Sequence, residues 1–520
     1  MQQQTLQPVA IQERIQTIDI IRGFALVGIL IINFTVDAGK TEPWAGFTGF
    51  IDQLVYWPVA FFMNDKFVAI YCFLFGLGFS IQMLRAKERN SPFVVVYLRR
   101  LIVLYIIGAI HQILTRGDIL GGYAMAGVLL LILHWLPRKL LPVLAVLCFI
   151  VPWTRQLINN MNQKTMTNQR TINVDTTQLD KIVGVYKVDN GTIHVITRKK
   201  DSLFGDGPAR HYELIPKTET VFKRSDGNTT YTFRKDSSGK VNEVVMEGPA
   251  ATAHGRRIDT NVEEALKKQQ EQQKTFAGNR SQETNSYKKF VIGNAQAFWN
   301  GFKNWSWKNY FWGFSIKGIL PMFLMGLYFG RRKVFYKISE NRLFLKNVMK
   351  WGLIIGMTSF AIALGVEAWN YFNGIKDESY SFLTRHLFYA AWDFLGVMGM
   401  ALAYVAGLAL ILDKVEWKKR LSFLAPVGRM GLTNYLLQAA IISIIIEPYG
   451  FGLNGKAGPA WRLVMALASF VFIFLFSRWW FKRFRIGPAE WLWRSLTYLK
   501  FQPMRIKQPG KAEEKEDGNI

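Results

Sequence analysis

A histidine and an aspartate seven residues apart are the first side chains in this sequence that could carry out acid–base chemistry. His111 and Asp118 occur in YIIGAIHQILTRGDILGGYAMAG, where an apolar block meets a glycine-containing segment. A carboxylate can orient an imidazole and stabilise its charged form, as a general base requires. Because seven residues make two helical turns, a direct contact requires the chain to turn near Gly117. Without that turn, His111 is a hydrogen-bonded packing residue.

Polar side chains inside other apolar blocks are further candidates, because a charged group costs about 2.5 kcal/mol or more in a spanning helix. Asp19 and Arg22 stand one turn apart, where they could form a structural ion pair or contact a substrate. Asn33, deeper in the same block, could bind substrate or hydrogen-bond a neighbouring helix. His386 and Asp393 repeat the seven-residue spacing on one helical face. We predict that Arg22, Asn33, His386 and Asp393 contact substrate.

The segment APVGRMGLTNYLLQ places Arg429 and Asn434 near each other along one helix. A guanidinium in a membrane interior needs an anionic partner, either a buried carboxylate or a phosphate or carboxylate of a ligand. We therefore predict that Arg429 and Asn434 also bind substrate, and that either could stabilise an oxyanion.

Several common site types have no counterpart in the sequence. It contains no GxxxxGKS/T, GxSxG or HExxH motif and no spaced Cys/His cluster. The two cysteines, Cys72 and Cys148, both lie in apolar blocks and predict neither a disulfide framework nor a zinc site. We expect no metal, no bound cofactor and no ATP-driven transport by this chain alone.

The elements that must position these residues are apolar blocks of about 20 residues, the length that crosses a bilayer as a helix. Half of the 520 residues are apolar. We expect an all-α polytopic membrane bundle of about ten transmembrane helices. The predicted spans are 18–37, 67–86, 98–115, 119–136, 139–156, 308–330, 348–370, 386–412, 422–446 and 460–480. The shorter block 50–63 is predicted to be interfacial or re-entrant.

The net charge of +27 is explained by membrane topology and not by nucleic-acid binding. The basic residues flank apolar blocks, as in GRRK (330–333), WKKR (417–420) and FKRFR (481–485). Cytoplasmic loops concentrate lysine and arginine in this way. Both termini are therefore predicted to be cytoplasmic, in a multi-pass protein whose partner is the lipid bilayer.

A polar segment interrupts the apolar blocks and has the character of a separate domain. Its runs of β-branched and aromatic residues, such as IVGVYKV (182–188) and TYTFRK (230–235), are separated by turn signals. This spacing predicts a small antiparallel β domain, inserted on the extracytoplasmic side, followed by a polar helix or linker.

The predicted domains follow from these patterns. Residues 1–156 form an N-terminal membrane domain with five spans, and residues 157–305 form the extracytoplasmic insertion with its linker. Residues 306–500 form a C-terminal membrane domain, and residues 501–520 a disordered cytoplasmic tail. No oligomeric state follows from the sequence.

Several segments resemble the YeiB-like bacterial inner-membrane proteins, which carry a C-terminal domain of unknown function. They are IDIIRGFALVGILIINF (18–34), KFVAIYCFLFGLGFS (66–80), RRLIVLYIIGAIHQILTRGDIL (99–120), GRMGLTNYLLQ (428–438) and GPAEWLWRSLTY (487–498). The resemblance implies a multi-pass protein of the bacterial inner membrane.

The opening D-x-x-R-G-x-A, from Asp19 to Ala25, is also similar to that of transmembrane acyltransferases, including the heparan glucosaminide N-acetyltransferase group. In those proteins a cytoplasmic acyl-CoA reaches a histidine within the membrane, and the acceptor is on the far side. The similarity implies that His111, with Asp118 beside it, is the corresponding histidine, and that acyl-CoA is a co-substrate.

The insertion resembles small lipocalin-like domains appended to penicillin-binding-type esterases. The matching residues are Gly184, Tyr186, Phe233 and D-x-x-G-x-V (236–241). This likeness implies a domain that binds the acceptor or a glycan, or that docks the protein.

Three functions remain open on these grounds. The first is transfer of an acyl group from cytoplasmic acyl-CoA to an extracytoplasmic hydroxyl or amine of a cell-envelope or glycan acceptor, with His111 as general base. The alternative is a transporter or lipid flippase, in which Arg429, Asp393 and His386 would line a path. The third is a membrane scaffold that presents the β domain.

Overall fold

The fold was analysed in a computed structural model of the chain. It describes residues 15–35, 49–90, 93–115, 117–148, 176–189, 192–206, 211–224, 229–237, 239–248, 252–267, 286–303, 319–372, 395–454 and 456–506. The chain divides into two compact units, one formed by 1–153 and 286–520 and the other by 154–285. Each unit is described by itself.

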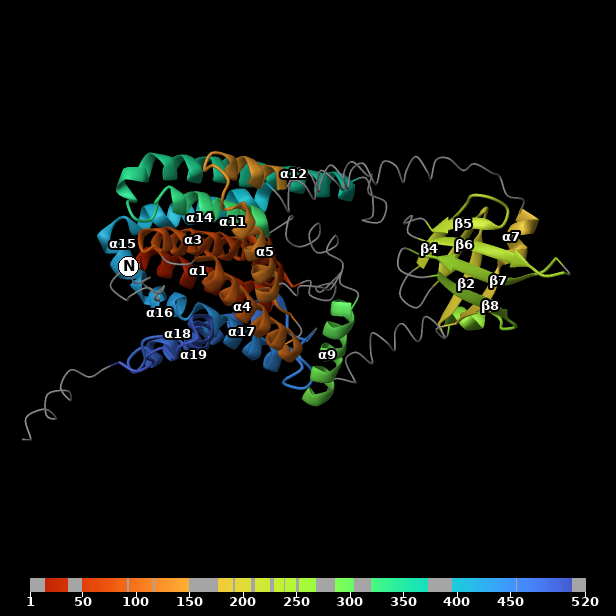
Figure 1. Cartoon of the computed structure of the whole chain (residues 1–520). Helices are drawn as coiled ribbons and strands as arrows, with labels where there is room; N and C mark the ends of the chain where they lie inside the picture. Colours follow the sequence, from red (N-terminus) through yellow and green to blue (C-terminus); the bar gives the residue numbers. More distant parts are fainter. Residues whose placement is uncertain are drawn as a thin grey trace, which may run out of the picture. The chain divides into compact units, whose positions relative to one another are not determined.

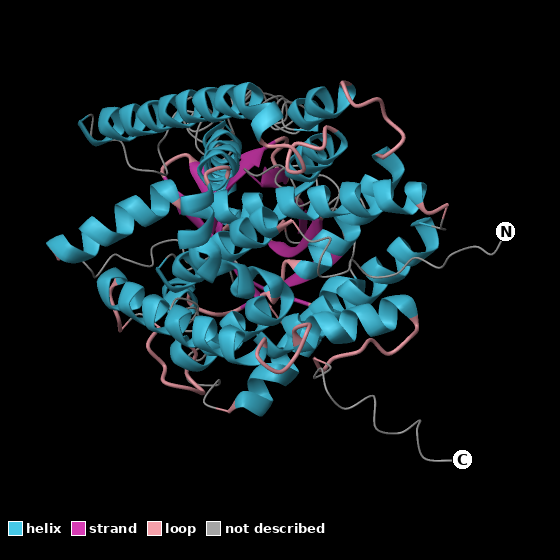
Figure 2. Cartoon of the chain, turned by 90° about the vertical axis from the view of Figure 1, so that its left-hand side faces the viewer, coloured by secondary structure: helices cyan, strands magenta, loops and turns pink. Residues whose placement is uncertain are grey.

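The first unit is helical. Before the insertion its helices are α1 (Gln16–Thr35), α2 (Phe50–Phe62), α3 (Lys66–Glu88), α4 (Phe93–Thr115) and α5 (Leu120–Leu133). After it follow α9 (Tyr287–Lys303), α11 (Leu320–Arg331), the 3₁₀ turn η3 (Ser339–Asn341), α12 (Arg342–Phe372), α14 (Val397–Leu412), α15 (Val415–Arg420), the 3₁₀ turn η6 (Leu421–Phe423), α16 (Leu424–Arg429), α17 (Gly431–Ile446), α18 (Pro459–Trp480) and α19 (Pro488–Tyr498). Figure 2 shows these helices side by side in a bundle.

Helix α1 lies inside this bundle, in contact with α3, α16 and α18 (Figure 1). Helices α3 and α11 cross closely because glycines face each other. A Cβ atom at Gly76 would overlap the carbonyl oxygen of Phe323, and one at Gly326 would overlap that of Phe73. Small residues at such crossings let membrane helices pack backbone to backbone. The first and second halves of the chain are thereby joined in one core.

The prediction of about ten transmembrane helices is wrong. Among the described residues, five helical stretches are long and apolar enough to cross a membrane, or six if α14 and the segment Val415–Arg429, bent by 106°, count as one span. The five are Gln16–Thr35, Phe50–Glu88, Phe93–Thr115, Ser339–Val366 and Pro459–Trp480. These apolar helices make the chain a membrane protein.

The overcount has a physical cause, because hydropathy measures apolar content and does not detect helix breaks. The predicted span 119–136 becomes α5, with 14 residues. The span 422–446 divides at Met430, where φ is −99° and ψ 38°, into helices of six and 16 residues. All three are shorter than the roughly 20 residues that a bilayer requires. The predicted spans 139–156, 308–330 and 386–412 extend beyond the described residues.

The second unit is a closed barrel and not merely a small antiparallel domain, so that prediction is corrected. After helix α7 (Thr176–Ile182), eight strands each pair antiparallel with the next, and β8 pairs with β1. The strands are β1 (Gly184–Val188), β2 (Ile193–Lys199), β3 (Ser202–Asp206), β4 (His211–Pro216), β5 (Val221–Arg224), β6 (Thr230–Lys235), β7 (Val241–Glu247) and β8 (Thr252–Ile258). Closure removes the exposed strand edges that a sheet would present.

Aromatic side chains fill the barrel. Tyr186, Phe222, Tyr231 and Phe233 are buried in its core. The Tyr186 hydroxyl donates to the Ile182 carbonyl at 2.7 Å, and burial raises the pKa of Tyr186 to about 12. Helix α7 is thereby tied to the barrel wall.

A short polar chain lies beside these rings. The hydroxyls of Tyr212 and Tyr231 are 2.6 Å apart, and Nδ1 of His194 lies 3.0 Å from the Tyr212 hydroxyl. Burial, together with the nearby charge of Arg224, lowers the pKa of His194. Burial and the contact with Tyr231 raise the pKa of Tyr212. At neutral pH these three hydrogen-bonded side chains are therefore uncharged.

Candidate functional site

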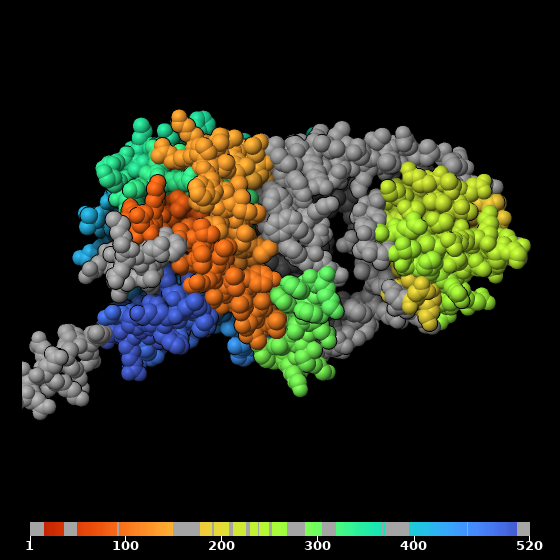
Figure 3. All heavy atoms as spheres, in the orientation of Figure 1, coloured from red at the N-terminus to blue at the C-terminus, as the bar shows by residue number. Residues whose placement is uncertain are grey.

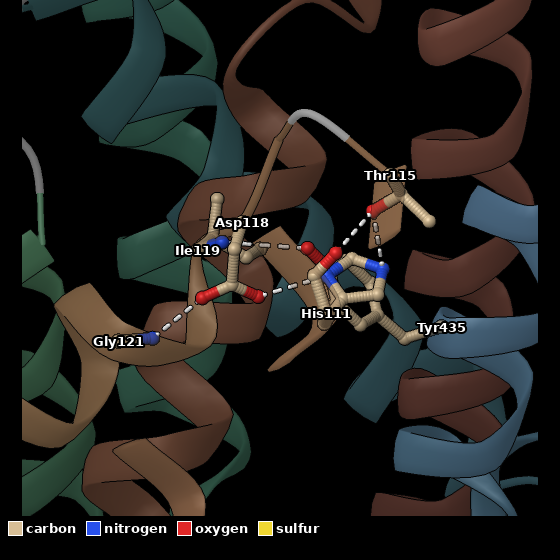
Figure 4. A network of polar contacts seen from close by, with 6 residues as sticks. All are labelled: His111, Thr115, Asp118, Ile119, Gly121 and Tyr435. Carbon is tan, nitrogen blue, oxygen red and sulfur yellow. Dashed lines mark hydrogen bonds and ion pairs between the residues drawn. The ribbon is translucent and has the colours of Figure 1, made fainter. Parts of the chain in front are cut away.

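His111 and Asp118 form a buried polar pair where α4 ends (Figure 4). The Nδ1 atom of His111 lies 3.1 Å from Oδ1 of Asp118, and the two side chains are 5% and 2% exposed. His111 is in the last turns of α4, and Asp118 is in the connection to α5. The turn near Gly117 that a direct contact requires is therefore present.

Asp118 also holds the start of α5. Its second oxygen, Oδ2, accepts the Gly121 N–H at 2.7 Å, one of the N–H groups that a helix start leaves without a partner inside the helix. Gly108 on α4 makes room for this carboxylate, because a Cβ there would lie 2.6 Å from Oδ2 and 2.7 Å from the Gly121 nitrogen. One carboxylate thus joins the histidine to the helix junction.

Thr115 contacts the second ring nitrogen of the imidazole, Nε2. Its Oγ1 lies 2.8 Å from the His111 carbonyl oxygen and 3.1 Å from Nε2 of His111, and its single hydroxyl proton can be donated to either acceptor, one at a time. If Nδ1 carries the proton and donates it to Asp118, Nε2 has a lone pair and can accept a proton. This is the tautomer that a general base needs, and Thr115 lies beside its basic atom.

Tyr435 brings the C-terminal half of the chain to the pair. Its ring centroid lies 5.1 Å from that of His111, and its hydroxyl accepts the Ile119 N–H at 3.3 Å. Figure 4 shows Tyr435 reaching His111 from a helix other than α4 and α5. That helix is α17, which begins at the break that follows Arg429.

A first cavity, of about 180 Å³, lies in the bundle next to residues that adjoin this pair. Ile119 and Tyr435 line it near His111, and Arg100 lines it as well. Arg100 is eleven residues before His111 on α4, which is about 16 Å along the helix axis. The cavity therefore extends from Ile119 and Tyr435 to a group of arginines, which are Arg22, Arg100, Arg429 and Arg494.

Contacts hold three of these arginines in place. Arg22 donates to Asp19 at 3.3 Å. The Arg100 guanidinium lies 3.9 Å from the Trp493 ring centroid, and the indole N–H donates to the Arg100 carbonyl at 2.9 Å. Arg429 lies 4.0 Å from the Phe481 ring centroid and donates to the Arg485 carbonyl at 3.4 Å.

A buried carboxylate, Glu490, completes the lining and fixes α17. It accepts the Leu432 and Thr433 N–H groups at 2.6 and 3.1 Å and the Thr433 hydroxyl at 2.5 Å. With Asp19 it gives the lining two carboxylates against four arginines. The first cavity therefore carries a net positive charge, which favours an anionic ligand.

A second cavity, of about 450 Å³, has Asp118 in its lining. Helix α4 supplies Tyr105, Ala109 and Gln112, helix α5 Gly121, Gly122 and Met125, and helix α9 Ala297, Phe298, Gly301 and Phe302. Asp118 lines this cavity while it contacts His111, and Ile119, the next residue, lines the first cavity. The His111–Asp118 pair thus adjoins both cavities, the second through Asp118 itself and the first through Ile119 and Tyr435.

The residues predicted to bind substrate are distributed unevenly. Arg22 and Arg429 line the first cavity. Asn434 is buried, and its amide nitrogen donates to the Val427 carbonyl at 2.9 Å and to Ser477 at 3.0 Å, so it connects α16, α17 and α18. Asn33 is exposed and lines neither cavity. His386 and Asp393 lie outside the described residues.

Sequence reasoning missed Thr115, Tyr435, Arg100, Glu490 and Trp493. Tyr435 lies in GRMGLTNYLLQ, and Glu490 and Trp493 lie in GPAEWLWRSLTY. Both segments stood out in the sequence, but no spacing rule connects them with His111. Among the described residues, no three His, Cys, Asp or Glu side chains gather as metal ligands.

Comparison with known proteins matches residues 329–500 to a family described as "Protein of unknown function (DUF418)". This region contains Arg429, Tyr435, Glu490 and Trp493, whereas His111 and Asp118 precede it. No solved structure matches the chain.

Three relatives extend the comparison. The chain is 25% identical to the uncharacterized protein YxaH of Bacillus subtilis (strain 168), over 97% of this chain and 99% of the relative. It is 37% identical over 127 residues to an uncharacterized 39.9 kDa protein in the amylase 3′ region of Bacillus acidopullulyticus, covering 24% of this chain and 36% of that protein. It is 43% identical over 74 residues to the uncharacterized protein YeiB of Escherichia coli (strain K12), covering 14% of this chain and 19% of that protein. The expected resemblance to YeiB-like proteins is confirmed.

Proposed function

We propose that this chain is a membrane-bound acyltransferase that moves an acyl group from acyl-CoA to a hydroxyl or amine acceptor. The observation that carries the proposal is that the His111–Asp118 pair adjoins two cavities. Asp118 lines the larger one, and Tyr435, whose ring lies against His111, lines the one that is rich in arginines. Two substrates that react at one base need separate approaches to it. The arginine-lined cavity suits a ligand that carries phosphates, because one guanidinium group can donate two parallel hydrogen bonds to two oxygens of a phosphate.

The chemistry assigned to the pair is general-base catalysis. Asp118 accepts the Nδ1 proton of His111 in a hydrogen bond, and Nε2 takes the proton of the acceptor hydroxyl or amine. The acceptor oxygen or nitrogen forms a bond to the thioester carbonyl carbon, and the carbon–sulfur bond breaks. The thiolate then takes the proton from His111 and leaves as free CoA.

Charge that develops on the thioester oxygen needs a donor, and Tyr435 is the best candidate. Its hydroxyl oxygen accepts the Ile119 N–H, so its own O–H can donate to an oxyanion in the first cavity. Loss of one such donor typically slows an enzyme by about 10²- to 10³-fold. Asn434 is a weaker candidate, because its amide already connects three helices.

The same proposal includes a location and an orientation. The protein lies in the bacterial inner membrane with both termini in the cytoplasm, because lysine and arginine flank alternate apolar blocks. The arginine-lined cavity then faces the cytoplasmic pool of acyl-CoA. The barrel is extracytoplasmic, on the side of a cell-envelope or glycan acceptor.

Binding of the donor can be tested without knowledge of the acceptor. The purified protein in detergent is heated with acetyl-CoA, a long-chain acyl-CoA or free CoA, and its unfolding is followed. A ligand at 100 times its Kd adds about 2.7 kcal/mol of stability, which raises Tm measurably. Arg100→Gln should reduce this rise. Arg420→Gln is the matched control, since Arg420 is an exposed basic residue that does not line the cavity.

Transfer is tested with radiolabelled acetyl-CoA and an extract of bacterial cell envelope. The wild-type protein should move label into the extract, and His111→Ala should not, although it still binds CoA. Label transfer by His111→Ala would disprove the role of the histidine. If no thioester raises the Tm of folded protein, the alternative gains support: a transporter or lipid flippase in which the two cavities are successive substrate positions.

A further inference from the structure

We infer that the second cavity binds the hydrocarbon part of a membrane-borne acceptor, so that the hydroxyl or amine accepting the acyl group belongs to a lipid or a lipid-linked molecule. This inference rests on the proposed function and specifies its acceptor. The carrying observation is a mainly apolar cavity that is lined by Asp118, the partner of the proposed general base, and has an amphipathic helix as its wall.

The lining favours hydrocarbon. The surface of the cavity is mainly apolar, and its lining includes Ala109, Met125, Ala297, Phe298 and Phe302. A free sugar would lose its water hydrogen bonds there and find few replacements, at a cost of about 1–3 kcal/mol for each unsatisfied group. A hydrocarbon chain makes no hydrogen bonds to water, so its burial there has no such cost.

Polar side chains are few in the lining, namely those of Tyr105, Gln112 and Asp118. Asp118 is its carboxylate, and both oxygens already accept hydrogen bonds, from His111 and Gly121. Gln112, one residue after His111 on α4, adds an exposed amide. A ligand with a hydrocarbon chain and a polar head therefore fits with its head toward Asp118 and Gln112.

The size of the cavity agrees with this assignment. At about 450 Å³ it lies within the range of ligand sites, roughly 300–1,000 Å³, whereas the first cavity, at about 180 Å³, is below it. The first cavity therefore suits the narrow thioester arm of the donor. The larger space is left for the body of the second substrate.

Helix α9 connects the cavity to the bilayer. Its Trp299 and Phe302 are 54% and 56% exposed, with ring centroids 5.9 Å apart, and the Lys303 ammonium lies 5.5 Å from the Trp299 ring centroid. Exposed aromatics beside a lysine are typical of the boundary between lipid and water. Phe302 also lines the cavity, so the apolar surface continues from the cavity to the outside of the helix.

Helix α9 is fixed at the end of α4. Asn294 donates to the Ile113 carbonyl at 3.1 Å, and the Tyr287 hydroxyl donates to the Leu114 carbonyl at 3.4 Å. These carbonyls belong to the last turn of α4, which lacks helical donors of its own. Figure 3 shows α9 (green) against the adjoining helix surface. Exposed Ile106 and Ile110 on α4 provide a lipid-facing surface next to this entrance.

The inference is tested by photolabelling, which requires no acyl transfer. The full-length protein in detergent is incubated with a long-chain primary alcohol that carries a diazirine in its chain, irradiated, digested and analysed by mass spectrometry. Labels should map to the cavity lining on α4, α5 and α9. They should also form on His111→Ala, so a failure of the proposed chemistry would not abolish them.

Two tryptophan substitutions on neighbouring positions separate the cavity from the lipid surface. Ala109→Trp fills the cavity and should reduce its labelling to background. Ile110→Trp, one residue further on the exposed face of α4, should leave the labelling unchanged. Equal labelling of the cavity in both variants would overturn the inference, provided that both unfold at the wild-type temperature. A folding defect in Ala109→Trp is avoided with Ala297→Trp, on an exposed position of α9.

Competition identifies the occupant. Excess unlabelled long-chain alcohol should prevent labelling. If a long-chain acyl-CoA prevents it and acetyl-CoA does not, the cavity holds the acyl chain of the donor and the inference is wrong. If a soluble sugar prevents it, the acceptor is not membrane-borne and the inference is again wrong.

Discussion

The Nδ1 atom of His111 lies 3.1 Å from Oδ1 of Asp118, although the two residues belong to different turns of the chain. The contact exists because α4 ends at Thr115 and α5 begins at Leu120, so the intervening turn brings the aspartate back over the last turns of α4. This relationship turns two separated polar residues into one acid–base unit.

Replacing Asp118 with Asn should leave the protein folded and slow the transfer. An Asn side chain can still accept the Gly121 N–H, but it carries no charge to stabilise a protonated His111. General-base assistance is worth about 10²- to 10⁴-fold, so the loss should fall within that range. The measurement is the release of free CoA from acetyl-CoA in the presence of envelope extract. A rate within twofold of wild type would show that His111 acts without Asp118.

Replacing Asp118 with Ala should also affect stability. The Gly121 N–H then loses its side-chain partner, which typically costs about 1 kcal/mol at a helix start. A lower Tm for Asp118→Ala than for Asp118→Asn would separate the structural role of the carboxylate from its chemical role.

Thr115→Val should keep most of the transfer activity. The hydroxyl of Thr115 contacts Nε2 of His111 and must leave that atom when the acceptor binds there. Its removal frees Nε2 and retains a side chain of similar shape. Steady-state kinetics and intact-protein mass spectrometry provide the measurement. Loss of activity in Thr115→Val, together with an acyl adduct on wild-type protein, would instead identify Thr115 as a nucleophile.

Gly108→Ala should destabilise the protein and disturb the site. The added Cβ would lie 2.6 Å from Oδ2 of Asp118 and 2.7 Å from the Gly121 nitrogen. Such overpacking costs about 1–3 kcal/mol. Gly117→Ala is the matched control, because nothing lies within 4 Å of a Cβ at Gly117. Comparison of Tm and CoA release tests the prediction, and equal values for the two variants would contradict it.

The barrel should lose stability in acid through His194. Burial and Arg224 lower the pKa of this histidine below its ordinary value of about 6.5. The unfolded chain therefore binds the proton more readily than the barrel, so stability is complete above about pH 6.5 and falls as the pH drops toward the folded-state pKa. Hydrogen exchange of β2 amides in the full-length protein, corrected for intrinsic rates, measures the effect. His194→Gln should show a weaker dependence on pH.

The first half of the candidate site could be predicted from sequence, because His111 and Asp118 are close along the chain and their residue types indicate the chemistry. Tyr435 could not, since its hydroxyl meets the Ile119 N–H across 316 residues. Arg100 was visible only as one of many basic residues beside an apolar block. Its relation to Trp493 depends on the packing of α19 against α4, which no periodicity encodes.

The sequence also predicts the local features of the fold better than the non-local ones. The strands rich in β-branched and aromatic residues were evident, whereas β3 and β8, with the sequences SLFGD and TAHGRRI, lack that signature. Without β8, nothing in the sequence indicates that the sheet closes. The number of spans was overestimated because apolar composition does not reveal where α16 gives way to α17.

The double attachment of Asp118 has a mechanical consequence. One oxygen of Asp118 accepts a hydrogen bond from the start of α5, and the other contacts His111 on α4. The carboxylate therefore connects the two helices and fixes the angle between them. A change in this angle must lengthen one of these two contacts. The orientation of the His111 imidazole is therefore coupled to the packing of α4 against α5.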